Sequence, residues 1–70
     1  MITVDQIRQR LIFEIQSSGI SQREIAIGLG VSEPTVSQYM SGRAMPSLET
    51  FANLCKLLDL DPSYLLCIKD

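Results

Sequence analysis

Residues 33–41, EPTVSQYMS, carry the side chains of this chain that are best suited to hydrogen bonding without charge. If they form a helix, Val36, Tyr39 and Met40 share one side and belong to a core. The opposite side, called here the polar strip, presents Pro34, Ser37, Gln38 and Ser41, with Thr35 at its margin. A glutamine amide can pair with adenine, hydroxyls suit several base edges, and a proline ring can rest on a thymine methyl group. The strip could therefore read DNA bases, the plainer interpretation being a solvated helix face.

Residues around the polar strip suit contacts to a nucleic-acid backbone. Gln22 and Arg23 stand at the expected start of a preceding helix, where free N–H groups and the helix dipole favour an anion. Arg43 follows the strip and could reach a phosphate from a loop. Glu33 could accept a hydrogen bond from cytosine, or it could only stabilise the positive end of the helix dipole. For the two arginines, the simple alternative is solubility.

The hydrophobic spacing predicts five short helices and no sheet, because no segment alternates apolar and polar residues. The first helix ends at Ser17-Ser18-Gly19, and its apolar side holds Val4, Ile7, Leu11 and Ile15. Ser21 and Glu24 have the spacing of a capping box and open the second helix. Ser47 caps the fourth helix, and Asp61-Pro62 opens a last turn. The apolar side of the fourth helix holds Phe51, Leu54, Cys55 and Leu58.

The second and third helices are expected to form a helix-turn-helix. Ser32 caps the third helix and Pro34 falls in its first turn, where a missing N–H costs nothing. The connection between the helices, residues 30–32, is too short for antiparallel packing, so the two must cross steeply. Ala26 allows close approach, Gly30 can take the positive φ of a sharp turn, and Val36 packs back. A simple helical hairpin would explain the glycine alone.

On these residues the chain resembles the lambda repressor/Cro-like (XRE) helix-turn-helix family. The matching pieces are SQREIA, LGVSEPTVSQY, SGR and PSLETFANLCKLLDL, between Ile20 and Leu66. The resemblance implies an all-α, five-helix, lambda-repressor-like domain over residues 1–70, whose third helix enters the DNA major groove. Ile15 and Met40 depart from the family, since many members place an Arg–Glu pair there. Apolar packing in place of a buried ion pair is often neutral or stabilising, so the fold is not put in doubt.

The composition of the chain limits the classes of function that it can have. The chain has 70 residues, 46% of them hydrophobic, two cysteines and no histidine. Two thiols without histidine cannot form a zinc site, and the chain offers no histidine as a general base and no nucleophile with a base partner, so we expect no metal, no cofactor and no enzyme. No apolar run approaches the length of a membrane span and no secretory signal is seen, so we expect a cytoplasmic domain with reduced cysteines. The net charge of −2 falls on residues 47–70, which should face away from DNA.

These observations predict a DNA-binding transcription regulator, most simply a small repressor that binds a palindromic operator as a homodimer. The expected DNA contacts are Gln22, Arg23, Ser32, Glu33, Pro34, Thr35, Ser37, Gln38, Ser41 and Arg43. A dimer is expected because so few cations give a monomer little affinity for phosphate. Spare apolar residues could form its interface: Phe13, Leu57, Leu66 and Ile68, with the C-terminal ones preferred. The alternative is an antitoxin-type or other protein-interaction module of the same fold, with a toxin or another protein as partner.

Overall fold

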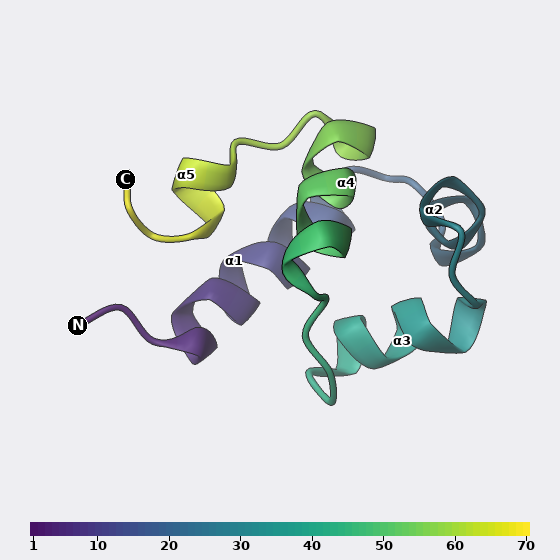
Figure 1. The fold of residues 1–70 in the computed structure, drawn as a ribbon, viewed down its shortest axis with the longest axis horizontal. Coiled ribbons are helices and arrows are strands. Elements are labelled where there is room, and N and C mark those ends of the chain that lie inside the picture. Colours follow the sequence, from purple (N-terminus) through teal and green to yellow (C-terminus); the bar gives the residue numbers. More distant parts are fainter.

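A computed structural model describes all 70 residues and contains five helices and no strand (Figure 1). The helices are α1 (Val4–Ser17), α2 (Gln22–Leu29), α3 (Glu33–Ser41), α4 (Leu48–Leu58) and α5 (Pro62–Leu65). The predicted all-α, five-helix fold is therefore confirmed. No helix combines the length and the apolar character that crossing a bilayer requires.

A short polar side chain begins each helix by accepting a hydrogen bond from a backbone N–H of the first turn. These caps are Thr3, Ser21, Ser32, Ser47 and Asp61. The capping box predicted at Ser21 and Glu24 is only half formed, because the Glu24 carboxylate accepts from the Ser21 hydroxyl instead of its backbone N–H. The complete box lies at α1, where Gln6 Oε1 accepts from the Thr3 N–H at 2.9 Å.

The core lies where α1, α2, α3 and α4 meet, with α5 closing one end. Its buried members are Leu11, Ile15, Ile25, Ala26, Val36, Phe51, Leu54, Cys55 and Leu65. α2 packs against α3 and α4, while α5 packs against α1. Ile15 is buried and Met40 packs against the same cluster, so both positions at which the family often places an ion pair are apolar here.

Cys55 acts as one of these core side chains. Burial, and secondarily the negative charge of Asp61, raises the pKa of its thiol. Because thiolate is the reactive form, a raised pKa keeps the Cys55 sulfur unreactive. Neither Cys55 nor Cys67 forms a disulfide.

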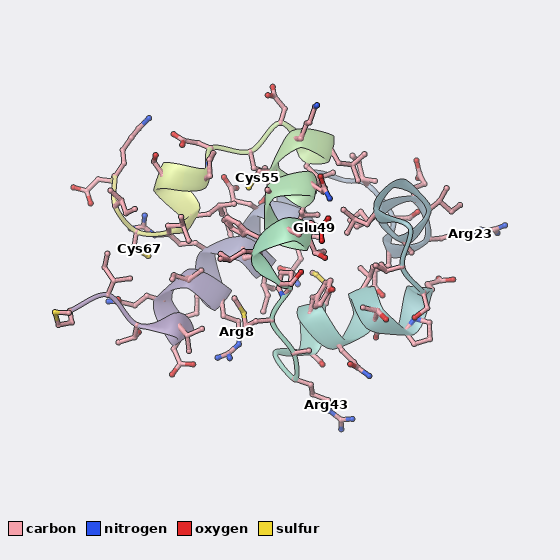
Figure 2. All side chains as sticks on the ribbon, in the orientation of Figure 1. Arg8, Arg23, Arg43, Glu49, Cys55 and Cys67 are labelled. Atoms are coloured by element: carbon pink, nitrogen blue, oxygen red, sulfur yellow. The ribbon has the colours of Figure 1, made fainter.

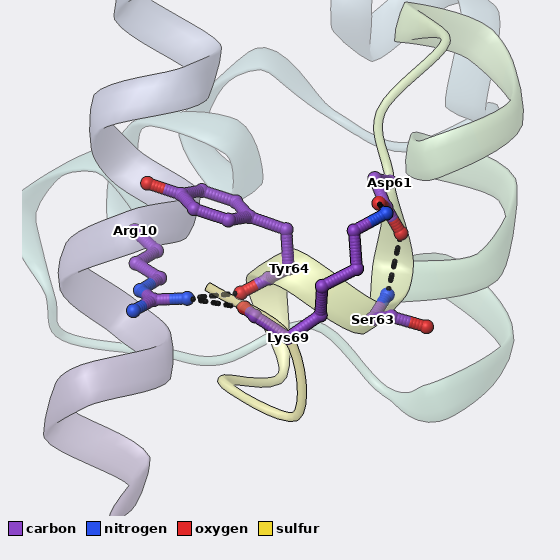
Figure 3. Close-up of polar contacts among 5 residues, drawn as sticks. All are labelled: Arg10, Asp61, Ser63, Tyr64 and Lys69. Carbon is purple, nitrogen blue, oxygen red and sulfur yellow. Dashed lines mark hydrogen bonds and ion pairs between the residues drawn. The ribbon is translucent and has the colours of Figure 1, made fainter.

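The start of α1 departs from the predicted apolar side. Val4 is 52% exposed and Ile7 only half-buried, so the buried side begins at Leu11. Arg10 is not part of that apolar side, yet it lies against the C-terminal segment. Its Nη1 donates to the carbonyl oxygens of Tyr64, at 2.7 Å, and Lys69, at 3.0 Å (Figure 3). The guanidinium also lies 4.4 Å from the centroid of the Tyr64 ring, a distance suited to a cation–π contact.

An ion pair fastens the same segment on its other side. Lys69 Nζ donates to Asp61 Oδ2 at 2.7 Å, while Asp61 Oδ1 caps α5 through the N–H of Ser63 (Figure 3). The hydrogen bond from Lys69 is the main reason why the pKa of Asp61 is lowered. The C-terminal residues are thus held to α1 by Arg10 and to the start of α5 by Lys69.

This ion pair should make the stability of the domain depend slightly on pH in the acidic range. A carboxyl whose pKa is lowered by folding stabilises the folded state above its unfolded pKa, about 3.9, and this contribution is lost as pH falls through the folded pKa. Asp61→Asn keeps a cap acceptor but loses the charge. We therefore expect urea unfolding to show wild type as the more stable protein at neutral pH, with the difference vanishing in strong acid. An equal difference at both pH values would contradict this.

Candidate nucleic-acid interface

The turn between α2 and α3 has the geometry that the sequence predicts. In Figure 1, α2 is seen nearly end-on whereas α3 runs across the view, so the two helices cross steeply. Gly30 has φ +72°, in the left-handed region that glycine tolerates. The N–H of Val31 donates to the carbonyl of Ala26 at 3.1 Å, which closes the turn. Ala26 and Val36 are both buried, as expected for the contact between the helices.

The polar strip lies on the surface of α3. Pro34, Ser37, Gln38 and Ser41 are exposed and Thr35 is half-buried, while Val36 and Tyr39 on the other side are buried. The Ser41 hydroxyl donates to the carbonyl of Gln38 at 3.1 Å, so its proton is already used within α3. The side chains of Ser37 and Gln38 have no partner within the chain. They are the residues of the strip whose full hydrogen-bonding capacity remains for a ligand.

Ser32 and Thr35 are joined to each other at the start of α3. Ser32 Oγ accepts from the N–H of Thr35 at 3.2 Å and lies 2.7 Å from Thr35 Oγ1. One hydroxyl proton of the pair is therefore used internally, and Ser32 acts first as the helix cap. Glu33 is exposed, is the first residue of α3 and forms no salt bridge, which suits it to the positive end of the helix dipole.

Arg43 is fixed relative to the polar strip by its backbone. Gly42 ends α3 with φ +80°, and the N–H groups of Arg43 and Ala44 both donate to the carbonyl of Gln38, at 3.0 and 3.3 Å. The side chain of Arg43 is exposed, forms no salt bridge and projects away from the domain beyond the end of α3 (Figure 2). A phosphate beside the end of α3 would meet this cation.

The start of α2 offers a second place for a phosphate. Gln22 and Arg23 are the first two residues of α2 and both are exposed, with Arg23 projecting into solvent (Figure 2). Backbone N–H groups of a first helical turn have no partner within the helix and attract anions. The carboxylate of Glu24, beside the cap, opposes that attraction. Gln22 and Arg23 thus lie at one end of the helix-turn-helix and Arg43 at the other.

Arg8 is a further cation that the sequence interpretation did not assign to the interface. Its side chain extends from α1 to the end of α3: a Cβ placed on Gly42 would lie 3.3 Å from Cδ of Arg8. The signal was present in the spacing, because Arg8 precedes the buried Leu11 by three residues and Ile15 by seven. That spacing puts Arg8 on the inward side of α1.

Residues 13–65, more than half of the chain, match a family model described as helix-turn-helix (HTH_3). The chain belongs to this family. The match starts within α1 and ends within α5, so it includes both helices of the helix-turn-helix and the turn between them. No curated protein and no solved structure shows significant similarity to the chain.

Membership in the HTH_3 family confirms the resemblance to lambda repressor/Cro-like proteins that the residues between Ile20 and Leu66 indicate. In helix-turn-helix proteins the second helix of the motif enters the major groove, and α3 holds that position in this chain. The fold and the family together support a DNA-binding regulator. They do not identify the base-contacting residues, which have to be inferred from the geometry of α3.

Proposed function

We propose that this chain is a sequence-specific regulator of transcription that reads its DNA site through the polar strip of α3. The observation that carries the proposal is the exposed, uncharged strip on α3, in which Ser37 and Gln38 have no internal hydrogen-bond partner. Because unpaired amides and hydroxyls can bond to base edges, these two residues supply discrimination. Pro34, Thr35 and Ser41 add shape and further hydrogen-bond acceptors, while Glu33 supports the helix start.

Backbone contacts then fix how α3 sits in the groove. Gln22 and Arg23 hold a phosphate at the start of α2, Ser32 supports the start of α3, and Arg43 holds a phosphate beyond its end. Contacts of this kind position a protein without reading sequence. Asp59 ends α4 and Asp61 begins α5, near the end of α4 that points away from α3 in Figure 1, so these two carboxylates stay clear of the duplex. Residues 1–70 act as one DNA-binding domain in this proposal.

The working form in this proposal is a two-fold dimer that represses by occluding a promoter. With only six lysines and arginines in the chain, a monomer can neutralise few phosphates and gains little from counterion release. Two copies double the number of phosphate contacts and of base contacts. Recognition helices related by a two-fold axis would enter successive major grooves about 34 Å apart, so the operator should be an imperfect palindrome.

Replacing Gln38 by alanine should relax base preference at one position of each half-site. The loss of a paired amide should cost about 1–3 kcal/mol against the preferred base and nothing against others. Selection of bound sequences from a random DNA pool, repeated with Gln38→Ala and Thr35→Ala, measures this directly. Base preferences that survive both substitutions unchanged would contradict the assignment of α3 as the reading helix.

Arg43→Ala should behave differently, because its expected partner is a phosphate. Binding to all sequences should weaken alike, and the slope of log K against log salt should fall in magnitude by about 0.9. Titrations of one operator and one unrelated duplex, each over a range of salt concentrations, separate this result from loss of base reading. A change confined to the operator would show that Arg43 contacts bases instead.

A further inference from the structure

Arg8 lies at the end of α3 although it belongs to α1. A Cβ placed on Gly42 would be 3.3 Å from Cδ of Arg8 and 3.9 Å from its Nε, so the arginine stem lies against the residue that ends α3. Arg43 is the next residue along the chain. In Figure 2 the side chains of Arg8 and Arg43 both extend toward the lower side of the molecule, along which α3 also runs. Two cations thus border the same end of α3.

Most of the hydrogen-bonding capacity of Arg8 is unused. Its side chain is only 26% exposed, which confines the stem, yet Nε is buried without a partner. Its internal polar contact is an ion pair from Nη1 to Asp5. A guanidinium offers five N–H donors in a planar fork that matches phosphate. A confined arginine with free donors loses little conformational entropy when it binds an anion.

The partner of Arg8 is easily replaced. Asp5 is 75% exposed and lies three residues away on the same helix. Exposed pairs of this kind contribute little to stability, so a phosphate can displace the carboxylate at small cost. In the free protein Asp5 nevertheless neutralises Arg8, which explains why the charge balance of α1 gave no indication of a cationic site.

We propose that Arg8 binds a backbone phosphate of DNA beside the end of α3, next to the phosphate held by Arg43, and that Asp5 competes with this phosphate. The inference rests on the DNA-binding function proposed above and adds a contact from outside the helix-turn-helix. It also explains how a chain with few cations gains affinity, because Arg8 is neutralised only until DNA displaces Asp5.

The test measures dissociation constants on the selected operator over a range of salt concentrations. For Arg8→Gln we expect weaker binding and a slope of log K against log salt reduced in magnitude by about 0.9, as for one lost phosphate contact. Asp5→Asn should bind up to about fivefold tighter, the most that an exposed pair is worth. In the Arg8→Gln background, Asp5→Asn should bring no such gain. Asp59→Asn removes an equal charge far from α3 and serves as the matched control.

Any of three results would overturn the proposal. The first is an unchanged salt slope for Arg8→Gln, and the second is a gain in affinity from Asp5→Asn no larger than that from Asp59→Asn. The third is an equal gain from Asp5→Asn in the Arg8→Gln background. Thermal unfolding checks that each variant is folded. If Arg8→Gln does not fold, the comparison of Asp5→Asn with Asp59→Asn decides, since only Asp5 competes with the phosphate for Arg8. Failure of the DNA-binding function itself would appear separately, as an absence of any effect from Gln38→Ala and Arg43→Ala.

Discussion

If Ile68 forms the interface of the proposed dimer, Ile68→Asp should weaken binding to a palindromic operator by about 100-fold or more, because separating the dimer removes the gain from engaging two half-sites at once. Ile68 follows α5 and is 72% exposed, so its side chain is free to contact a second copy of the chain. A carboxylate buried in the interface without a partner of opposite charge opposes association. The fold should be unaffected, since the side chain lies outside the core.

The other spare apolar residues divide into separate groups in the structure. Leu57 is 42% exposed and lies over Gly28 on the α2 side of α4, whereas Ile68 follows α5, which packs on α1. Leu66 is half-buried and packs against the core, so it is less available than the sequence suggests. Phe13 is 62% exposed on α1. Leu57 and Ile68 therefore offer alternative interfaces, and a variant of each is needed.

Light scattering combined with binding to one and two half-sites provides the measurement. The dimer requires either Ile68→Asp or Leu57→Asp to give a folded monomer that binds the full palindrome no better than a half-site. The unaffected one of the two then serves as the control for added charge. A wild-type protein that remains monomeric at tens of micromolar, and binds one half-site as tightly as the palindrome, would contradict a dimer.

Ala26→Leu should destabilise the domain by about 1–3 kcal/mol through overpacking. Ala26 is 4% exposed, between α2 and α3, and its carbonyl accepts from the N–H of Val31 in the turn. A larger side chain forces the two helices apart at the place where they approach closely. Each kcal/mol lowers the melting temperature of a domain of this size by about 4–8 °C. Since small domains have only about 0.05–0.15 kcal/mol of stability per residue, the loss is a large fraction of the total.

Ala52→Leu is the matched control, because Ala52 lies in α4 and is exposed. The same substitution there adds apolar surface without filling any contact, so its melting temperature should stay close to that of wild type. Circular dichroism during heating measures both variants. Equal melting temperatures for Ala26→Leu and the parent would mean that the contact between α2 and α3 is looser than the burial of Ala26 indicates.

The positions of the helices could be predicted because their signals are local. Ser32 caps α3 through the N–H of Thr35, three residues away, and Gly30 supplies a positive φ that few other residues tolerate. Likewise, the exposed side of α3 follows from which of its residues are apolar. The same reasoning could not show that the Ser41 hydroxyl donates to the carbonyl of Gln38, because that hydrogen bond depends on the rotamer of Ser41.

Contacts between distant parts of the chain could not be predicted from the spacing of residues. The carbonyl groups bonded by Arg10 lie 54 and 59 residues away, and a backbone carbonyl leaves no trace in residue type. Arg8 was overlooked for a related reason, because Asp5 balances its charge locally while Gly42, which it lies against, is remote in sequence. Val4 fits the apolar spacing but sits at a helix end, where no neighbour covers it.

The contacts of α1 set the boundaries of a portable module. Leu11 is a core residue, only 1% exposed, and Arg10 donates a hydrogen bond to the carbonyl of Lys69. Residues 10, 11 and 69 nevertheless lie outside the segment that matches the family model. Thr3 begins α1 still further upstream. Grafting the DNA-binding activity onto another protein would therefore require residues 3–69, because a transplant limited to residues 13–65 would leave behind part of its own core.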